Sequence, residues 1–157
     1  MEEQRISREQ LYIQIALLIS QRATCCRLSV GAVAVKDNRM ILSGYNGPAK
    51  DEPHCNPLDC DVDKACVRAV HAEDNLIRSA KELGINLQGA TLFCTHQPCL
   101  NCSIKILRAG FEKVFFLHPY RLEDGLVNLV NNDIEVYQID EQGKYTRRQP
   151  VDISKVL

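Results

Sequence analysis

The fold is decided by residues 90–139, which read ATLFCTHQPCLNCSIKILRAGFEKVFFLHPYRLEDGLVNLVNNDIEVYQI. Short apolar runs alternate there with segments of helical periodicity, and a glycine follows the first of those segments as a helix-ending cap. The predicted elements are a strand at 90–95, a helix at 99–109, a strand at 113–117, a helix at 123–130 and a strand at 134–139. Because helical crossovers join parallel neighbours, we expect these three strands to lie parallel in one sheet.

The residues upstream add two strands to this sheet. A β-branched run at 30–36 and an apolar run at 40–45 flank the turn pair Asp37-Asn38, which predicts a hairpin. Between the hairpin and the next helix, the stretch Gly47 to Lys64 is rich in proline and acidic residues, and we interpret it as one long functional loop.

Two more helices complete the pattern. The first is capped by Ser7, runs to about Arg22, and is expected to bury the face formed by Leu11, Ile15, Leu18 and Ile19. The second runs from about residue 69 to 83 and stops at a glycine. The order α-β-β-α-β-α-β-α-β predicts a mixed five-stranded sheet covered by helices, in one α/β domain that spans residues 1–157.

Length and charge narrow the function classes. The chain has 157 residues, which is close to one ordinary domain. Its formal net charge is -1, so it has no broad positive field to hold polymeric nucleic acid, and a small-molecule substrate is expected.

Eight cysteines stand out in a chain that is long enough to fold without disulfides. The sequence begins Met1-Glu2-Glu3, acidic where a signal peptide is basic, and its nearby apolar run at 15–19 is far shorter than the ~20 residues of a membrane span. We therefore expect a cytoplasmic protein without membrane contact. In that reducing compartment clustered cysteine and histidine are metal ligands or a catalytic thiol.

Two local patterns carry the chemistry: His71-Ala72-Glu73 and Pro98-Cys99-Leu100-Asn101-Cys102. Each lies at the start of a predicted helix, where unpaired amides favour thiolates. His71, Cys99 and Cys102 supply three ligands of a tetrahedral zinc and leave the fourth position open, as catalytic sites do.

Glu73 is poorly placed as a fourth ligand and fits a proton shuttle beside the metal. The combination of H-x-E with P-C-x-x-C is typical of zinc nucleobase deaminases. The alternatives are a structural zinc knuckle or a redox pair for the two cysteines, and a solvated helix start for His71 and Glu73.

Four segments resemble the deoxycytidylate (dCMP) deaminase family, especially its bacterial and phage members, including late-competence-type proteins. They are CRLSVGAV (26–33), RMILSGYNG (39–47), CVRAVHAEDN (66–75) and THQPCLNC (95–102), and the resemblance extends over about residues 8–140. One departure is Leu76, where the family usually has alanine.

The resemblance implies the three-layer cytidine-deaminase-like fold and hydrolysis of dCMP to dUMP and ammonia, which supplies dUMP for thymidylate synthesis. In that reaction zinc activates the water that attacks C4 of cytosine and Glu73 shuttles protons. The backbone around Ala72 would hold the base.

The resemblance also implies how the rest of the nucleotide is bound. Asn46 matches the family residue that contacts the sugar, and Arg27, Tyr120 and Arg121 match positions near the 5′-phosphate, where arginine forks suit a dianion. The alternatives are solvated surface arginines for Arg27 and Arg121 and a simple turn residue for Asn46.

Family members can be activated by dCTP, inhibited by dTTP and assembled as hexamers, so the resemblance implies an allosteric homohexamer. Magnesium would accompany a nucleoside triphosphate effector.

A second, structural zinc is also expected from bacterial and phage relatives, with Cys25, Cys55 and His96 matching its ligands. The fourth ligand stays open among His54, Cys60 and Cys66. Several of these residues could instead be buried thiols, and Cys94, in the middle of an apolar strand, fits that role best.

Two other function classes compete with dCMP deamination. One is a related zinc deaminase that acts on cytidine, guanine or a tRNA adenosine. The absence of a basic face argues against the tRNA substrate. The other is a non-catalytic zinc-stabilised binding protein, which would have no use for Glu73. The polar tail after Asp140 is expected to be a solvated end or a subunit contact.

Overall fold

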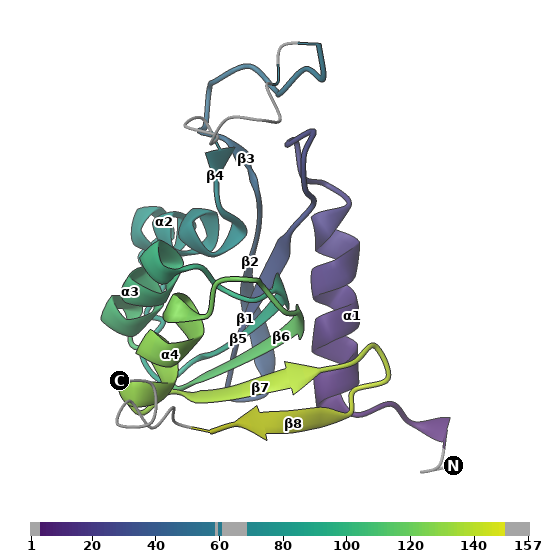
Figure 1. The fold of residues 1–157 in the computed structure, drawn as a ribbon, viewed down its shortest axis with the longest axis vertical. Helices are drawn as coiled ribbons and strands as arrows, with labels where there is room; N and C mark the ends of the chain where they lie inside the picture. Colours follow the sequence, from purple (N-terminus) through teal and green to yellow (C-terminus); the bar gives the residue numbers. More distant parts are fainter. Residues whose placement is uncertain (1–3, 59, 61–68, 150–157) are drawn as a thin grey trace.

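One mixed β-sheet organises the chain, which the computed structural model describes at residues 4–58, 60 and 69–149 (Figure 1). The strands of this sheet are β1 (Gly31–Lys36), β2 (Arg39–Tyr45), β5 (Thr91–His96), β6 (Lys113–His118), β7 (Glu135–Ile139) and β8 (Tyr145–Arg148). Their order across the sheet is β2-β1-β5-β6-β7-β8. The Pro98-Cys99 motif follows β5, one of the two central strands of this sheet.

The parallel core of the sheet confirms the prediction from residues 90–139. β5 pairs with β6 and β6 with β7, both in parallel, and α3 (Leu100–Ala109) and α4 (Asp124–Asn131) are the two crossovers. The β1–β2 hairpin is antiparallel, as expected, and β1 also pairs antiparallel with β5. The sheet is therefore mixed, and its parallel part consists of β5, β6 and β7.

The predicted sheet of five strands is one strand short, because residues 145–148 of the tail form β8, a mostly exposed edge strand that extends the sheet to six. The carboxylate of Asp140 accepts hydrogen bonds from the backbone of Gln142 and Lys144 and so closes the turn. Tyr145 then packs edge-on against Phe115. A four-residue polar edge strand carries no clear alternation, which is why the sequence did not reveal it.

A second correction concerns residues 69 and 70, which were expected to begin a helix. They form β4 (Ala69–Val70), which pairs antiparallel with β3 (Gly47–Pro48), and α2 (Ala72–Leu83) starts after them. The β3–β4 pair closes the base of the predicted loop at 47–64. Residues 59 and 61–64 of that loop lie outside the described part of the chain, as does Cys66.

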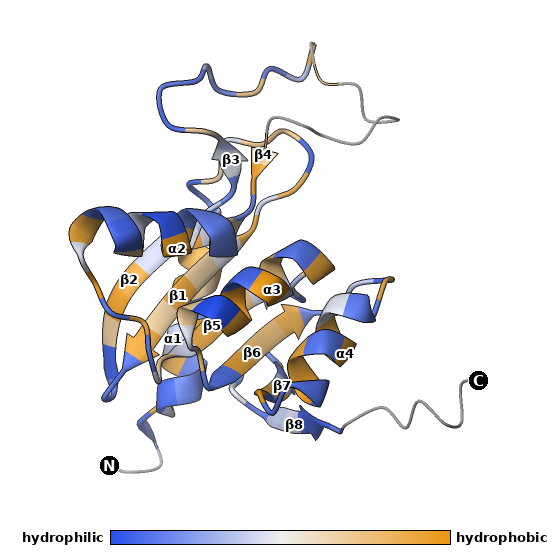
Figure 2. Cartoon of the chain, turned by 90° about the vertical axis from the view of Figure 1, so that its left-hand side faces the viewer, coloured by the Kyte–Doolittle hydropathy of each residue, from blue (hydrophilic) through white to orange (hydrophobic). Residues whose placement is uncertain are grey.

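Helices cover both faces of the sheet in three layers. α1 (Arg8–Ser20) lies on one face, and α2, α3 and α4 lie on the other (Figure 1). Figure 2 shows the apolar central strands between these layers. On the α2–α4 side the fully buried residues include Leu76, Leu92 and Ile106, and on the α1 side Ile13 and Val33.

The buried face of α1 matches the expected one only in part. Ile15 and Ile19 pack against the core on this side of the sheet, but Leu11 and Leu18 are exposed. The buried residues are Tyr12, Ile13 and Ala16. Apolar residues occur on nearly every side of this helix, so periodicity alone could not select the face. None of the helices in the described ranges is long and apolar enough to cross a membrane.

Gly44 decides how closely α2 can approach β2. A Cβ atom at this position would lie 2.6 Å from the carbonyl oxygen of Ala72 and 2.9 Å from the backbone nitrogen of Leu76. Both contacts are with helix backbone, which cannot give way as a side-chain tip can. The absence of a side chain at Gly44 therefore sets the position of the helix that carries Glu73.

We expect Gly44→Ala to lower the free energy of unfolding by about 1–3 kcal/mol through overpacking. For a domain of this size that corresponds to a fall of about 2–12 °C in the melting temperature, measured by calorimetry. Ser43→Ala, one residue away, is the control and should cost less than about 1 kcal/mol. Unfolding of Gly44→Ala at the wild-type temperature would contradict the close contact.

Candidate active site

The predicted metal ligands lie at the N-termini of two neighbouring helices. His71 is the residue that caps α2, and Cys99 is the one that caps α3. Neither uses its side chain to cap the helix, so the imidazole and the thiol are available for another partner. Cys102, in the first turn of α3, is buried beneath them.

The three side chains meet at distances that suit one metal ion. Nδ1 of His71 lies 3.5 Å from Sγ of Cys99 and 3.3 Å from Sγ of Cys102. Zinc bonds of about 2.0–2.3 Å in a tetrahedron put neighbouring ligand atoms about 3.6 Å apart. Among the described residues, this is the only group of three histidine, cysteine or acidic side chains close enough to share a metal ion. The donor set therefore fits zinc with one position left for a water molecule or substrate.

Hydrogen bonding among the three groups sets their charges. The pKa of Cys99 is lowered to about 4, first by the hydrogen bond with Cys102 and then by that with His71. The pKa of Cys102 is raised, because its thiol is the donor to Cys99 and is also buried. The hydrogen bond with Cys99 raises the pKa of His71. One thiolate is thus already favoured in this cluster, and the α3 N-terminus supports it.

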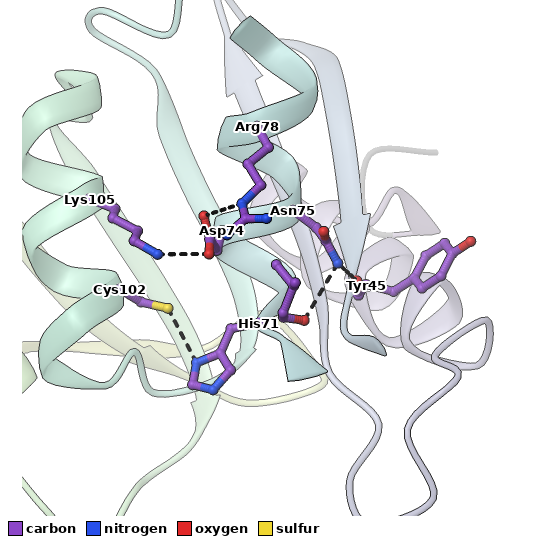
Figure 3. A network of polar contacts seen from close by, with 8 residues as sticks. Tyr45, His71, Asp74, Asn75, Arg78, Cys102 and Lys105 are labelled. Carbon is purple, nitrogen blue, oxygen red and sulfur yellow. Dashed lines mark hydrogen bonds and ion pairs between the residues drawn. The ribbon is translucent and has the colours of Figure 1, made fainter. Parts of the chain in front are cut away.

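A salt-bridge network ties the two ligand-bearing helices together (Figure 3). The Asp74 carboxylate accepts from Lys105 Nζ of α3 at 2.7 Å and from Arg78 Nε of α2 at 3.1 Å. Burial raises the pKa of Asp74, but these two cations outweigh it and the net shift is downward. The ion pair between Asp74 and Lys105 thus holds α2 against α3 near the metal ligands His71 and Cys102.

Glu73 lies two residues after His71, in the first turn of α2. Its side chain is only 4% exposed, and its carboxylate faces the Cys102 thiol. Oε1 of Glu73 also accepts a hydrogen bond of 3.1 Å from the thiol of Cys94 on β5. A buried carboxylate beside an open metal position can take a proton from a bound water and pass it on.

A pocket of about 480 Å³ opens beside these groups, a size usual for small-ligand sites. It brings together most of the residues predicted to bind metal or substrate, namely Cys25, Arg27, Asn46, His71, Ala72, Glu73, His96, Cys99 and Tyr120. Arg121 is exposed and is not part of the lining, although it follows Tyr120 directly. Two larger cavities, of about 760 and 540 Å³, contain none of the predicted zinc ligands.

Asn46 has a structural task as well as a place in the pocket. Its Oδ1 accepts from the Val30 backbone and its Nδ2 donates to the Leu28 carbonyl, both at 2.7 Å. An amide has one further acceptor site and one further donor hydrogen, so a ligand contact stays open to it. The Asn46 side chain therefore fixes the segment 28–30, which follows Arg27. This structural role was not predicted from the sequence.

Gln97 is a pocket residue that the sequence analysis missed. Its side chain accepts from the Tyr120 backbone and donates to the Leu122 carbonyl, and its own backbone donates to His118. It is almost fully buried, so these bonds fasten the loop 119–122 over the pocket. The available signal was its position as a polar residue directly before the Pro98-Cys99 motif.

The expected ligands of a second zinc are only partly assembled. Cys25 and His96 line the same pocket, and the backbone of Cys55 donates to the Thr24 carbonyl. In the part of the chain that is described, however, these side chains do not form a group within ligand distance. A different thiol contact is present: hydrogen bonding with Cys26 is the main cause that raises the pKa of Cys60 to about 11.

Known proteins share these features. Residues 6–118 match the family model described as the cytidine and deoxycytidylate deaminase zinc-binding region. The ComE operon protein 2 of Bacillus subtilis is 38% identical over 144 residues, which cover 88% of this chain and 75% of that protein. The deoxycytidylate deaminase of Saccharomyces cerevisiae is 32% identical over 136 residues, 82% of this chain and 43% of the yeast protein.

Similarity extends to solved structures. The dCMP deaminase of cyanophage S-TIM5, solved in complex with dCMP and dUMP, matches with a TM-score of 0.77 and 33% identity, and the match covers 83% of this chain and 96% of that one. The family model includes both ligand motifs and Glu73, and the fold and metal cluster agree with it. The chain therefore belongs to the cytidine and deoxycytidylate deaminase family.

Proposed function

We propose that this protein is a zinc-dependent hydrolase that converts dCMP and water to dUMP and ammonia. The observation that carries the proposal is the buried Glu73 carboxylate beside the open His71, Cys99 and Cys102 cluster, inside a pocket of nucleotide size. Similarity to a phage dCMP deaminase solved with dCMP and dUMP supports the choice of substrate.

The chemistry divides between the metal and the protein. Zinc, when bound, supplies a Lewis acid that makes a water molecule acidic enough to attack at neutral pH. Glu73 takes one proton from the attacking water as the new C4–O bond forms and delivers it to the ring nitrogen. It then takes the second water proton from the new C4 hydroxyl and delivers it to the leaving amine as the C4–N bond breaks. Its burial excludes bulk water, so the carboxylate exchanges protons with the substrate.

The pocket lining supports a proposal for how the nucleotide is recognised. Arg27, Asn46, Ala72 and Tyr120 all lie in the lining. Arg27 and Tyr120 are proposed to meet the 5′-phosphate, Asn46 the sugar, and the backbone at Ala72 the base. Arg121, beside Tyr120, is proposed to reach the phosphate from the rim. A local arginine fork suits a chain whose formal net charge is only -1.

The wider setting is also part of the proposal. Residues 1–157 form one domain that works in the cytoplasm, where reduced thiols can bind zinc, and its product supplies thymidylate synthesis. The family resemblance supports a homohexamer activated by dCTP, with magnesium on the triphosphate, and inhibited by dTTP. The exposed apolar residues Leu11 and Leu18 of α1 are compatible with burial in such an assembly.

We also propose a second, structural zinc near the rim of the pocket. Cys25 and His96 share the lining, and Cys55 is hydrogen-bonded next to Cys25 through Thr24. Burial, followed by repulsion from His118, lowers the pKa of His96, so its imidazole is in the neutral form that binds metals. We propose Cys60, in thiol contact with Cys26, for the open fourth position, with His54 and Cys66 as the alternatives.

An ultraviolet assay of the purified protein tests the substrate. We expect turnover of dCMP and little or none of deoxycytidine, because deoxycytidine has no phosphate to offer to Arg27. CMP, dCTP and guanine complete the comparison, and replacing Arg27 by glutamine should raise the KM for dCMP by about tenfold or more.

Two results of this assay would contradict the proposal. A preference for deoxycytidine over dCMP would remove the phosphate site. No turnover of any of these compounds by zinc-loaded protein would favour the zinc-stabilised binding protein instead.

Metal analysis tests the second zinc. We expect about two zinc ions per chain, and about one after Cys55→Ser, because that variant removes a structural ligand and leaves the catalytic three intact. A single zinc per wild-type chain would show that the second site does not exist.

A further inference from the structure

Cys94 is the one cysteine of β5, and its sequence context predicted an inert buried thiol. The side chain is fully buried, and its Sγ lies 3.1 Å from Oε1 of Glu73. The residue thus touches the carboxylate that the proposed function uses for proton transfer. A core residue chosen only for its apolar character would have no such polar partner.

The strand fixes the direction of this thiol. Leu92 and Cys94 belong to the core beneath α2–α4, whereas Phe93 between them belongs to the core beneath α1. On the neighbouring strands Cys94 is paired with Ala32 and Phe116, both fully buried and without side-chain acceptors. Neither cross-strand partner therefore competes with Glu73 for the Cys94 thiol.

The thiol is the donor in this contact and the carboxylate is the acceptor. A protonated thiol has one hydrogen to donate, and at this site the donation goes to Glu73.

We propose that Cys94 is a positioning residue that holds Oε1 of Glu73 and so leaves Oε2 to exchange protons with the substrate. This inference rests on the proposed deaminase function. The strand is one of the two central strands of the sheet and is paired on both sides, so it provides a rigid anchor for a carboxylate that is carried by a separate helix. Without the anchor the Glu73 side chain could rotate, and fewer bound substrates would meet it in the reactive orientation.

Two substitutions of similar size separate this role from packing. Cys94→Val keeps an apolar side chain of similar volume and removes the donor, whereas Cys94→Ser restores a donor. At equal zinc content we expect Cys94→Val to lower kcat for dCMP by about tenfold with KM within about twofold, and Cys94→Ser to recover most of it. A purely packing role predicts the reverse order, because valine preserves the apolar core better than serine.

The second measurement needs no activity. The S–H stretching band of Cys94 is isolated as the infrared difference between the wild type and Cys94→Ser. The same band in the Glu73→Ala background is the difference between Glu73→Ala and the double variant that also carries Cys94→Ser. We expect the band to lie at higher frequency in that background, because a thiol that loses its hydrogen-bond acceptor vibrates at higher frequency. This readout applies even if Cys94→Val does not fold.

The outcomes are distinguishable. Wild-type kcat in Cys94→Val, or an S–H band that does not respond to Glu73→Ala, would overturn the positioning role. If the wild type itself fails to deaminate dCMP while the band does respond, the contact stands and the proposed function fails.

Discussion

The meeting of His71 with Cys99 and Cys102 is the constraint on which the rest of the site depends. The imidazole comes from the turn between β4 and α2, and the thiols come from the start of α3, so the cluster forms only when the two helices lie side by side. Gly44 lets α2 settle on the sheet, and Asp74 binds α2 to Lys105 of α3. Both features place Glu73 next to the same open metal position.

This arrangement explains why a nearly neutral protein can process a charged nucleotide. Two thiolates and a neutral imidazole would balance the charge of a bound zinc ion, so the proposed function requires only one further strong positive group in the pocket, the arginine proposed to meet the phosphate. Arg27 is in the lining, on a segment that the Asn46 amide fixes from both sides. Gln97 fastens the opposite wall, where Tyr120 lies. Two buried amides thus shape the pocket around one arginine.

Much of this could be predicted from the sequence, and the exceptions have physical reasons. The parallel strands, the two ligand motifs and Glu73 follow from periodicity and from the spacing of metal-binding residues. The strand β8 could not be predicted because a short polar edge strand is stabilised by Tyr145 packing on Phe115, a long-range contact. The partner of Cys94 was hidden for the same reason, since Glu73 is 21 residues away in sequence. Which face of α1 is buried depends on where the sheet packs against the helix, and the even spread of apolar residues around α1 does not indicate that side.

The most direct measurement of the account is turnover of dCMP by Glu73→Gln, alongside its zinc content and melting temperature. Glutamine keeps the size of the side chain but cannot carry the proton. The account predicts wild-type zinc content and stability with turnover reduced by at least about a hundredfold. A zinc-loaded, folded Glu73→Gln variant that deaminates dCMP at the wild-type rate would contradict it.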